Sequence, residues 1–481
     1  MIKIFTKKYV LIQSIYLLIS LFFVSNYIFS SQEKTNTPNF IFILADDQGW
    51  NGTSVRMNDT IPYSASDFYE TPNLEKLAKK GMVFSNAYAS APVCAPSRYS
   101  IQFGQTPARL QMIRVGMNTQ HIDHNKSRTL AKEIKNANPL YKTAHFGKWG
   151  MDSNPSALGY DESDGPTKNK DGYFNYNSRE LQWGNNISED PKKIFSITDK
   201  AINFIEKNVQ ENTPFFMQIS HYAIHSDLMM RKKTYEKYSK KVKGKIHNNI
   251  GLAAMTEDLD HSIGLIMKKL KELEIEDNTY IIYSSDNGSV PIIVPRRYYE
   301  QSYNYPLSRG KWDAMEGGIR VPFIISGPDI EEHSYNATNI SFSDLLPTII
   351  DIITAKKVKS ISLDGGSFKN ILFGKSKKIK RSTRGLIFHV PYENGIALKR
   401  AHSAIIQDNY KLIKFYDNNE IHLFDLEKDI FEKNDISKEK FKITKRLEAS
   451  LMNYLSKVKA PKWQKGITWK QKTLKKINSF H

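Results

Sequence analysis

The fold is decided first by residues 39–47, which read NFIFILADD. Every residue from Phe40 to Ala45 is apolar, a pattern typical of a strand that is buried on both faces of a parallel sheet. The run ends in two carboxylates, Asp46 and Asp47. Because ligands bind at the carboxyl ends of the strands in such sheets, this pair lies where a functional site is expected.

The same pattern repeats outward from this strand. We predict further buried strands at 141–146, 215–220, 279–285 and 321–326, and helices at 71–81, 129–137, 191–209, 248–273 and 342–353. Another helix is expected from Ser97 onward, with Cys94 just ahead of it. Strands that alternate with helices predict an α/β fold with a large mixed, mostly parallel sheet sandwiched by helices. The polar residues 152–186 are expected to form a long loop near the site.

A smaller unit follows the basic stretch 374–384. Short strands are predicted at 385–390, 402–407, 410–416 and 421–426, with a helix at 438–458. These elements indicate a smaller C-terminal α+β domain that carries a short antiparallel sheet. We therefore expect a catalytic domain at 38–374 and a smaller domain at 382–481, preceded by a signal peptide at 1–31.

The N-terminal residues favour export. Three lysines within the first eight residues precede an apolar segment at 9–29, and the small residues Ser30 and Ser31 follow, as in a secretory signal. A retained membrane anchor is the alternative, since the apolar segment approaches the length that spans a bilayer. The leading expectation is a periplasmic or secreted protein with no stable membrane span after cleavage.

The chain is strongly basic. Its 481 residues include 69 Lys and Arg against 50 Asp and Glu, which gives a formal net charge of +19. Such a surplus favours polyanionic partners, including nucleic acid, anionic lipid and sulfated glycan. Export argues against nucleic acid, and the sequence contains no zinc-finger spacing, RNA-recognition signature or Walker loop. We therefore expect no nucleic-acid partner.

Polar side chains directly follow four of the predicted strands. Asp46 and Asp47 follow the first, and Asp286 and Asn287 follow the strand at 279–285. Their oxygen atoms are hard donors of the kind that Ca²⁺ or Mg²⁺ takes, whereas zinc favours His and Cys. Either pair alone could instead cap a helix or form a turn. Two such pairs at two strand ends favour a metal site.

Cationic and imidazole side chains follow the other two strands. Lys148 follows the second strand, and His221 and His225 follow the third. Together with Arg98 and Lys311, Lys148 and His225 could hold a tetrahedral oxyanion. The alternatives are solvated surface lysines, and histidines that are hydrogen-bonded in the core or at the surface.

Cys94 is the only cysteine in the chain and has no partner for an intramolecular disulfide. It is a buried inert thiol, a partner in an intermolecular disulfide, or a thiol kept for chemistry. Residues 94–98 read CAPSR. This motif resembles the signature of the formylglycine-dependent sulfatases, the type I sulfatases of the alkaline-phosphatase superfamily, which present it to the enzyme that oxidises their cysteine.

Further motifs, in the order of that family, extend the resemblance over roughly residues 39–432. The family's two metal motifs resemble DDQG at 46–49 and SDNG at 285–288, and its anion-binding lysine motif resembles GKW at 147–149. Its second-lysine segment resembles RGK at 309–311 with EGGIRVP at 316–322. Its small C-terminal domain resembles NYKLI at 409–413 with LFDL at 423–426. The resemblance implies an alkaline-phosphatase-like fold.

The resemblance also implies a cofactor and a modification. A formylglycine-generating maturation enzyme would oxidise Cys94 to Cα-formylglycine. The cation, expected to be Ca²⁺ with Mg²⁺ as the alternative, would be held by Asp46, Asp47, Cys94, Asp286 and Asn287. One hydroxyl of the hydrated aldehyde would attack the sulfur of a sulfate ester, and the other would then expel sulfate.

Four cationic or imidazole residues would assist this reaction, as the resemblance implies. Arg98 and Lys148 would hold the nucleophile and the sulfate. His225, with Lys311 beside it, would protonate the leaving oxygen. The sequence departs from the family at Gly150, where members commonly have a histidine that helps to deprotonate the formylglycine diol.

His145 or His221 could take over the role of that histidine. Several residues are also candidate substrate contacts, although those in the predicted hairpins could equally be ordinary surface residues. These candidates are His145, His221, His389, Tyr392, Arg400 and His402.

The leading hypothesis is an exported sulfatase that acts on a sulfated carbohydrate or polysaccharide. A phosphodiesterase or phosphonate hydrolase of the same superfamily is the alternative among enzymes. A non-catalytic relative that binds sulfated glycans is the alternative from another class, and it is motivated by Gly150. The retention of Cys94, Lys148 and the metal-type residues argues against this last alternative.

Overall fold

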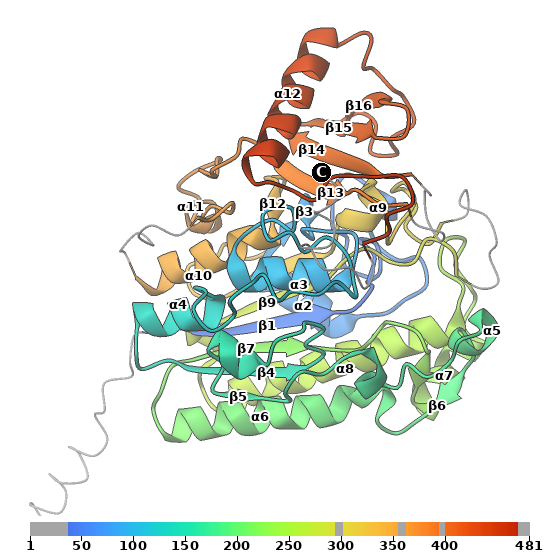
Figure 1. Cartoon of the computed structure of the whole chain (residues 1–481). Helices are drawn as coiled ribbons and strands as arrows, with labels where there is room; N and C mark the ends of the chain where they lie inside the picture. The colour runs from blue at the N-terminus through green and yellow to red at the C-terminus, as the bar shows by residue number, and fades with distance from the viewer. Residues whose placement is uncertain (1–36, 294–301, 355–361, 394–399, 470–481) are drawn as a thin grey trace, which may run out of the picture. The chain divides into compact units, whose positions relative to one another are not determined.

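An eight-stranded sheet forms the centre of the computed structural model, which describes residues 37–293, 302–354, 362–393 and 400–469 (Figure 1). Its strand order is β11-β2-β10-β9-β1-β7-β4-β5. The strands are β1 (Asn39–Ala45), β2 (Gly81–Phe84), β4 (Lys142–Gly147), β5 (Glu162–Ser163), β7 (Phe215–Ser220), β9 (Thr279–Ser285), β10 (Phe323–Ser326) and β11 (Ser334–Asn336). Only β10 runs antiparallel to its neighbours β9 and β2, which confirms the predicted mixed, mostly parallel sheet.

Strand β1 shows why helices cover both faces of this sheet. All of its residues are buried, and successive side chains point to opposite faces. Phe40, Phe42 and Leu44 join one apolar cluster, while Ile41 and Ile43 join another. Burying each such side chain stabilises the fold by about 1.5–3 kcal/mol. The continuous apolar run therefore requires a layer of helices on each side.

The helices supply these two layers, as Figure 1 shows for α3, α4 and α10 on one side and for α6 and α8 on the other. The first layer consists of α3 (Cys94–Phe103), α4 (Leu130–Ala137) and α10 (Leu345–Ile353). The second consists of α2 (Pro72–Lys79), α6 (Ile194–Gln210), α7 (Lys232–Lys240) and α8 (Ile250–Glu272). The remaining short elements are β3 (Ala87–Tyr88), α5 (Arg179–Gln182), β6 (Asn186–Ile187), β8 (Met229–Met230), α9 (Glu316–Ile319), β12 (Ile340–Ser341) and α11 (Lys369–Leu372).

Several predicted boundaries lie one to three residues from those in the structure, and two of these differences change the element to which a residue belongs. Gly81, predicted as the end of a helix, is the first residue of β2, where an added Cβ would lie 2.1 Å from the carbonyl oxygen of Ile325. Cys94, predicted just ahead of a helix, is the first residue of α3. The hydroxyl of Ser97 bonds both the amide and the carbonyl of Ala91, which ties the first turn of this helix to the preceding loop.

The C-terminal part contains a four-stranded antiparallel sheet, as predicted. It is formed by β13 (Leu386–Val390), β14 (His402–Gln407), β15 (Tyr410–Phe415) and β16 (Ile421–Asp425), and α12 (Phe441–Lys457) packs on it. Leu412 faces Leu447 and Leu451 of α12, whereas the next residue, Ile413, joins the large core. This sheet is thus buried between its own helix and the central layers (Figure 1).

The expected domain boundaries at 374 and 382 stay predictions, because the chain from Pro38 onward forms one compact unit. The predicted signal peptide at 1–31 lies outside the described residues. Within the described ranges, no helix is both long and apolar enough to cross a membrane.

Candidate active site

Four strand ends meet at one edge of the central sheet. Asp46 and Asp47 follow β1, and Asp286 and Asn287 follow its neighbour β9, in which Ser285 pairs with Ala45. The two pairs are bonded to each other: the amide of Asp47 donates to Asp286 Oδ1 over 3.2 Å, and Asn287 Nδ2 donates to Asp47 Oδ1 over 2.8 Å. All four side chains are buried. The structure therefore brings the four predicted metal-type residues together.

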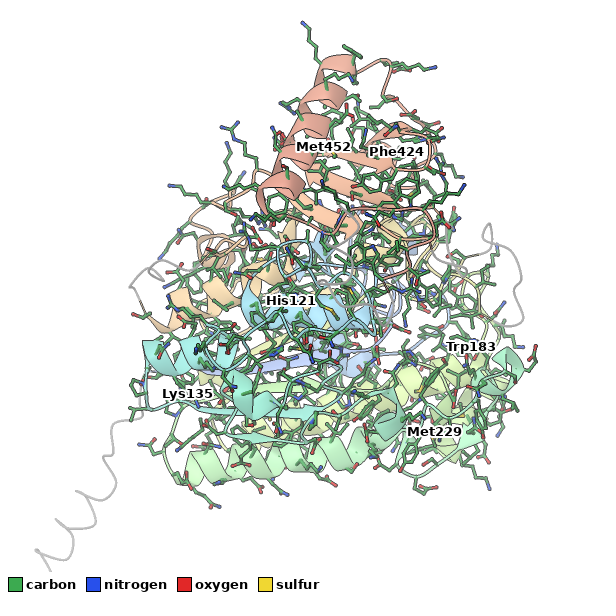
Figure 2. All side chains as sticks on the ribbon, viewed as in Figure 1. His121, Lys135, Trp183, Met229, Phe424 and Met452 are labelled. Carbon is green, nitrogen blue, oxygen red and sulfur yellow. The ribbon has the colours of Figure 1, made fainter. Side chains whose placement is uncertain are left out.

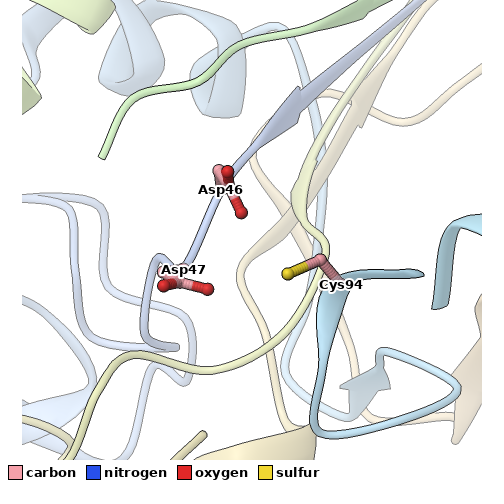
Figure 3. Close-up of side chains that lie close together, drawn as sticks. All are labelled: Asp46, Asp47 and Cys94. Carbon is pink, nitrogen blue, oxygen red and sulfur yellow. The ribbon is translucent and has the colours of Figure 1, made fainter. Parts of the chain in front are cut away.

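Cys94 lies against the first acidic pair. Figure 3 shows its sulfur pointing toward Asp46 and Asp47, and one ligand atom from each of the three residues lies within 4.8 Å of the others. The side chain is only 6% exposed, and burial raises the pKa of the thiol even though Lys148 and Lys311 lie nearby. An unmodified Cys94 thus stays a protonated thiol near neutral pH, which makes it a poor nucleophile.

Each of the three carboxylates has a cationic partner. Arg98, one turn after Cys94 on α3, donates from Nε to Asp286 Oδ2 over 2.9 Å and also bonds the carbonyl of Lys148. Lys148 Nζ lies 2.5 Å from Asp46 Oδ2, and Lys311 Nζ lies 2.6 Å from Asp47 Oδ2. Three buried negative charges are therefore balanced by three buried positive charges. A divalent cation would leave a positive surplus that suits an anionic substrate.

The surroundings set the charge of the acidic groups. Burial alone would raise the pKa of Asp47, but Lys311 and other nearby cations hold it below its usual value. Burial and the nearby Asp46 raise the pKa of Asp286 despite its bond to Arg98. A cation placed between these carboxylates would favour their charged forms.

His225 completes the cluster from the segment after β7. Burial lowers the pKa of its imidazole to about 3, so the ring is neutral at pH 7. Nδ1 donates to the carbonyl of Ser226 over 2.5 Å, which leaves Nε2 facing Asp47 Oδ2 at 3.6 Å. This second nitrogen is therefore the one available to exchange a proton with a bound ligand.

Two oxygen atoms in the cluster indicate how a metal would fit. Asp46 Oδ1 and Asn287 Oδ1 are buried and accept no hydrogen bond from the residues that the structure describes. A buried polar atom without a partner costs about 1–3 kcal/mol. Carboxylate and amide oxygens are the ligands that Ca²⁺ and Mg²⁺ take. The donor set thus fits a hard divalent cation.

A cavity of about 420 Å³ opens beside this cluster, and Asp47, His225 and Lys311 contribute to its lining. Its other walls combine aromatic, apolar and amide side chains. These are Phe174, Asn177, Gln182, Trp183, Ser226, Val290, Pro291, Ile292 and Trp312. Figure 2 labels Trp183, which lies beside α5 in the segment that was predicted to form a polar loop near the site.

Sequence reasoning missed the aromatic walls of this cavity. Trp312 directly follows Lys311, and Phe174 and Trp183 stand out as aromatic residues within an otherwise polar segment, a signal that could have identified them. It also missed Lys192, which is 1% exposed. Burial lowers the pKa of Lys192 to about 7, although the nearby Asp227 and Asp46 favour its charged form.

Three predicted substrate contacts have protein partners instead. His389 bonds Ser403 Oγ through Nδ1 and the carbonyl of Pro461 through Nε2. His402 Nε2 accepts from the amide of Ala314, and its Nδ1 donates to the carbonyl of Arg400. The guanidinium of Arg400 bonds Asp417 and Glu420. None of the three lines the cavity beside the cluster, and their role as substrate contacts stays a prediction.

The remaining candidates are enclosed. Tyr392 and His221 are 1% and 0% exposed, and neither lines the described cavity. His145 bonds Ser220 Oγ over 3.0 Å, and burial lowers its pKa to about 3. Among the described residues, neither histidine bonds Cys94 or the carboxylates of the cluster.

Gly150 lies against two of the cationic residues. A Cβ added to it would lie 3.1 Å from Arg98 Cδ and 3.7 Å from Lys148 Cε, so a side chain at this position would enter the cluster. Its φ of +69° also favours glycine. The position is therefore at the site, and even a Cβ there requires Arg98 to shift by a few tenths of an ångström.

Comparison with known proteins identifies the family. The chain matches the family model described as Sulfatase over residues 38–355, and the model described as N-sulphoglucosamine sulphohydrolase, C-terminal, over residues 311–461. A sulfatase of Formosa agariphila is 27% identical, over 91% of this chain and 93% of its own length. The human N-acetylgalactosamine-6-sulfatase is 26% identical, over 66% of this chain and 61% of its own length. An ulvan-active sulfatase of Formosa agariphila is 26% identical, over 68% of this chain and 63% of its own length.

Solved structures agree on the fold. The crystal structure of Ps i-CgsB in complex with k-i-k-neocarrahexaose has a TM-score of 0.71 at 23% identity, and the match covers 92% of this chain and 96% of that one. A phosphonate monoester hydrolase, SpPMH from Silicibacter pomeroyi, has a TM-score of 0.64 at 17% identity, with 87% and 95% covered. The fold is thus also that of a phosphonate monoester hydrolase. The sulfatase match, which spans most of the chain, decides the assignment: the chain belongs to the type I sulfatase family of the alkaline-phosphatase superfamily, enzymes that hydrolyse sulfate esters.

Proposed function

We propose that this protein releases sulfate from a sulfated carbohydrate, with a formylglycine derived from Cys94 as its nucleophile. The observation that carries the proposal is the position of Cys94, whose sulfur points at Asp46 and Asp47 (Figure 3). The cationic side chains of Arg98, Lys148 and Lys311 lie near the same thiol. The thiol itself is buried and protonated, so thiolate chemistry has no support. Oxidation by a maturation enzyme would replace this weak nucleophile by the hydroxyl groups of a hydrated aldehyde.

The acidic residues would hold the cation. Asp46, Asp47, Asp286 and Asn287 offer the oxygen ligands, including the two atoms that accept no hydrogen bond from the described residues. When bound, Ca²⁺, or Mg²⁺ as the alternative, would offset negative charge on the transferred group.

The cationic residues would bind the sulfate group. Lys148 and Lys311 are now paired with Asp46 and Asp47. A cation on these carboxylates would weaken both ion pairs and free the ammonium groups for sulfate oxygens. Arg98, fixed by Asp286 and by the carbonyl of Lys148, would orient the nucleophile. His225 is neutral with its proton on Nδ1, so Nε2 would first take up a proton as the anionic substrate binds. The imidazolium would then donate that proton from Nε2 to the leaving oxygen, while Nδ1 stays bonded to Ser226.

A sugar is the substrate class that the cavity suits best. Its volume of about 420 Å³ lies within the range typical of small-molecule sites. The flat faces of Trp183 and Trp312 can pack on a sugar ring, and Asn177 and Gln182 can bond its hydroxyl groups. The names of the relatives that act on ulvan or on N-acetylgalactosamine 6-sulfate agree with this choice.

Export is the other part of the proposal. The basic and apolar residues at the N-terminus support secretion to the periplasm or beyond, with cleavage near Ser31. N-terminal sequencing of the protein from its native host tests this. A mature chain that retains Met1 would contradict cleavage.

The test of the catalytic proposal combines mass spectrometry with sulfate release. We would produce the protein with a formylglycine-generating enzyme, determine the mass of the Cys94 peptide, and assay 4-nitrophenyl sulfate, a panel of sulfated oligosaccharides and a phosphonate monoester. We expect the aldehyde mass, release of sulfate from at least one sugar, and loss of both in Cys94→Ala. A thiol that persists beside a competent maturation enzyme would contradict the mechanism. Preferential hydrolysis of the phosphonate would favour the alternative enzyme class.

A further inference from the structure

A second, larger cavity of about 1000 Å³ lies elsewhere on the molecule and shares no lining residue with the one beside Cys94. It is lined by residues from three segments. These are residues 335–339, from β11 onward, residues 377–386, from the loop after α11 to the start of β13, and residues 406–409, from the end of β14 to the turn before β15. We call these three segments the basic groove.

The groove carries positive charge without ionic partners. Lys377, Lys378, Lys380 and Arg384 are exposed, and none forms an ion pair with any residue in the described ranges. Arg381 also lines the groove but is bound to Asp344. Asp408 is the only acidic residue of the lining. The cations are thus available to an anionic ligand.

Neutral side chains of the groove suit a sugar backbone. Tyr335, which is 43% exposed, offers an aromatic face. Thr338 and Gln407 provide groups that can bond hydroxyls. Inorganic phosphate would use only the cations of the groove. A sulfated sugar chain would use the cations for its sulfate groups and the neutral side chains for its sugar rings.

The groove is longer than one small anion requires. A smaller cavity of about 240 Å³ adjoins it and shares Thr383, Arg384, Gly385 and Gln407. This extension adds Lys457 of α12, which is exposed and forms no ion pair among the described residues. Several separate cations in two adjoining cavities fit a polyanion better than one small anion.

The topology relates the groove to the catalytic edge. β11 is parallel to β2, and β2 and β9 are both antiparallel to β10, so β11 ends at the same edge of the sheet as β9 and β1. Four strand spacings separate β11 from β1, which corresponds to roughly 19 Å. Residues 336–339 leave the sheet at that edge and enter the groove. A polysaccharide of several sugar units is long enough to reach from one site to the other.

We propose that the basic groove is a second binding site for sulfated polysaccharide, which holds the chain through sulfate groups that are not being hydrolysed. That the same polymer is the substrate rests on the proposed function. Binding in the groove itself needs no turnover, because none of the cluster around Cys94 takes part.

The binding test uses the full chain with Cys94→Ala, which prevents turnover. The groove variant is Lys377→Gln/Lys378→Gln/Lys380→Gln. The matched control is Lys233→Gln/Lys240→Gln/Lys243→Gln, which removes three exposed lysines of the α7 region that form no ion pair with described residues. The probes are fluorescent dextran sulfate, neutral dextran and a DNA duplex of similar charge, followed by anisotropy at physiological salt.

We expect the groove variant to bind dextran sulfate at least about tenfold more weakly, as loss of several ionic contacts to a polyanion implies, and the control to change little. Neutral dextran should not bind. Equal losses in both variants would overturn the proposal, because the attraction would then be diffuse net charge. DNA that binds as tightly as dextran sulfate would overturn it in favour of a nucleic-acid surface.

A kinetic test on the active enzyme distinguishes this inference from the proposed function. In the groove variant, the ratio of kcat/KM on a sulfated polymer to kcat/KM on 4-nitrophenyl sulfate should fall about tenfold, through KM. An unchanged ratio contradicts the role of the groove in holding substrate. If the wild-type protein hydrolyses no sulfate ester but the binding losses persist, the proposed function fails while the groove stands.

Discussion

Lys411 and Glu316 form an ion pair of 2.9 Å between Nζ and Oε1, with both side chains at 0% exposure. The same ammonium lies 2.7 Å from Glu432 Oε1, and Glu432 also accepts from the amide of Glu316. Lys411 belongs to β15 of the C-terminal sheet, whereas Glu316 begins α9, a few residues after Lys311. His402 makes a similar link to the amide of Ala314. The C-terminal sheet thus fixes the segment that carries Lys311 into the active site.

Replacement of Lys411 by Met should therefore destabilise the protein and lower its activity. Removing one partner of a buried ion pair costs about 3–5 kcal/mol, because the carboxylates stay buried without their cation. Urea unfolding measures this cost. The control Lys445→Met removes an exposed partner of Glu448 and should change the free energy of unfolding by less than about 0.5 kcal/mol. Similar values for the two variants would contradict the structural role of Lys411.

Glu432 should make stability depend on pH. Burial and the nearby Glu316 raise its pKa from 4.5 to about 7, although Lys411 opposes this. Between these two values the folded state binds more protons than the unfolded state, so stability falls as the pH rises through this window. The loss should be on the order of 2–3 kcal/mol.

The variant Glu432→Gln isolates this effect, since its side chain does not titrate. We expect its free energy of unfolding to fall less steeply between pH 4.5 and pH 7 than that of the wild type. Glu439→Gln, at an exposed position, is the control and should keep the wild-type slope. If the stability of the wild type and of Glu432→Gln depended on pH in the same way, the titration of Glu432 would not be the cause of the pH dependence.

Long apolar runs made the central strands predictable from sequence. The bounds of β1, β7 and β9 agree with the prediction because each run fills a strand that is buried on both faces. β2 was missed, since its four residues directly follow a helix, and β11 was missed because its three residues are partly exposed and have no apolar pattern. Short edge strands depend on neighbours that are distant in the sequence.

The position of the candidate site was also predictable, because strand ends of a parallel sheet meet at one edge. Its walls were not. The segment that carries Phe174 is held by Asp227, whose Oδ2 accepts from the amides of Asn175 and Tyr176, about fifty residues away in the chain. His389 and Arg400 were chosen for their chemistry alone. Their partners depend on strand pairing and loop contacts that no local pattern shows.

Divalent cations should stabilise the folded protein. Asp46 Oδ1 and Asn287 Oδ1 need a partner, and an ion that binds only the folded state raises the free energy of unfolding by about 2.7 kcal/mol at one hundred times its Kd. Removal of metal by a chelator should also abolish activity, and Ca²⁺ should restore it.

The variant Asn287→Ala should lose most of the Ca²⁺-dependent rise in melting temperature, whatever its stability without metal. Asn434→Ala, an exposed amide far along the chain, should keep the whole rise. A rise that survives in Asn287→Ala would place the ion elsewhere. Repeating the titration with Mg²⁺ decides which ion binds more tightly.

Gly150 is predicted to be required in this protein, although the family resemblance led us to expect a histidine at this position. The variant Gly150→Ala introduces a Cβ at 3.1 Å from Arg98 Cδ, in a backbone with φ of +69°. The left-handed conformation alone costs about 1–2 kcal/mol for an L-residue. A displaced Arg98 should in addition lower kcat for sulfate esters.

Gly150→His tests whether the family residue can be restored. We expect a stability loss at least as large as for Gly150→Ala and no gain in kcat. Gly165→Ala is the matched control, because Gly165 has a similar φ of +79° but no atom within 4 Å of an added Cβ. An increase in kcat for Gly150→His would show that the site lacks a base and has room for one.

His225 should matter most when the leaving group is poor. Its Nδ1 is bonded to Ser226, and its Nε2 faces Asp47 in the wall of the cavity. Once it has taken up a proton beside a bound anionic ester, the ring is oriented to give that proton from Nε2 to a leaving oxygen. For His225→Asn we expect kcat/KM on a sugar sulfate to fall by about 10²- to 10⁴-fold, the usual contribution of a general acid. The loss on 4-nitrophenyl sulfate should be much smaller, because its phenolate leaves without protonation. His261→Asn, at an exposed position on α8, should leave both rates near wild type. Equal losses on the two substrates would show that His225 binds the sulfate group and does not donate the proton.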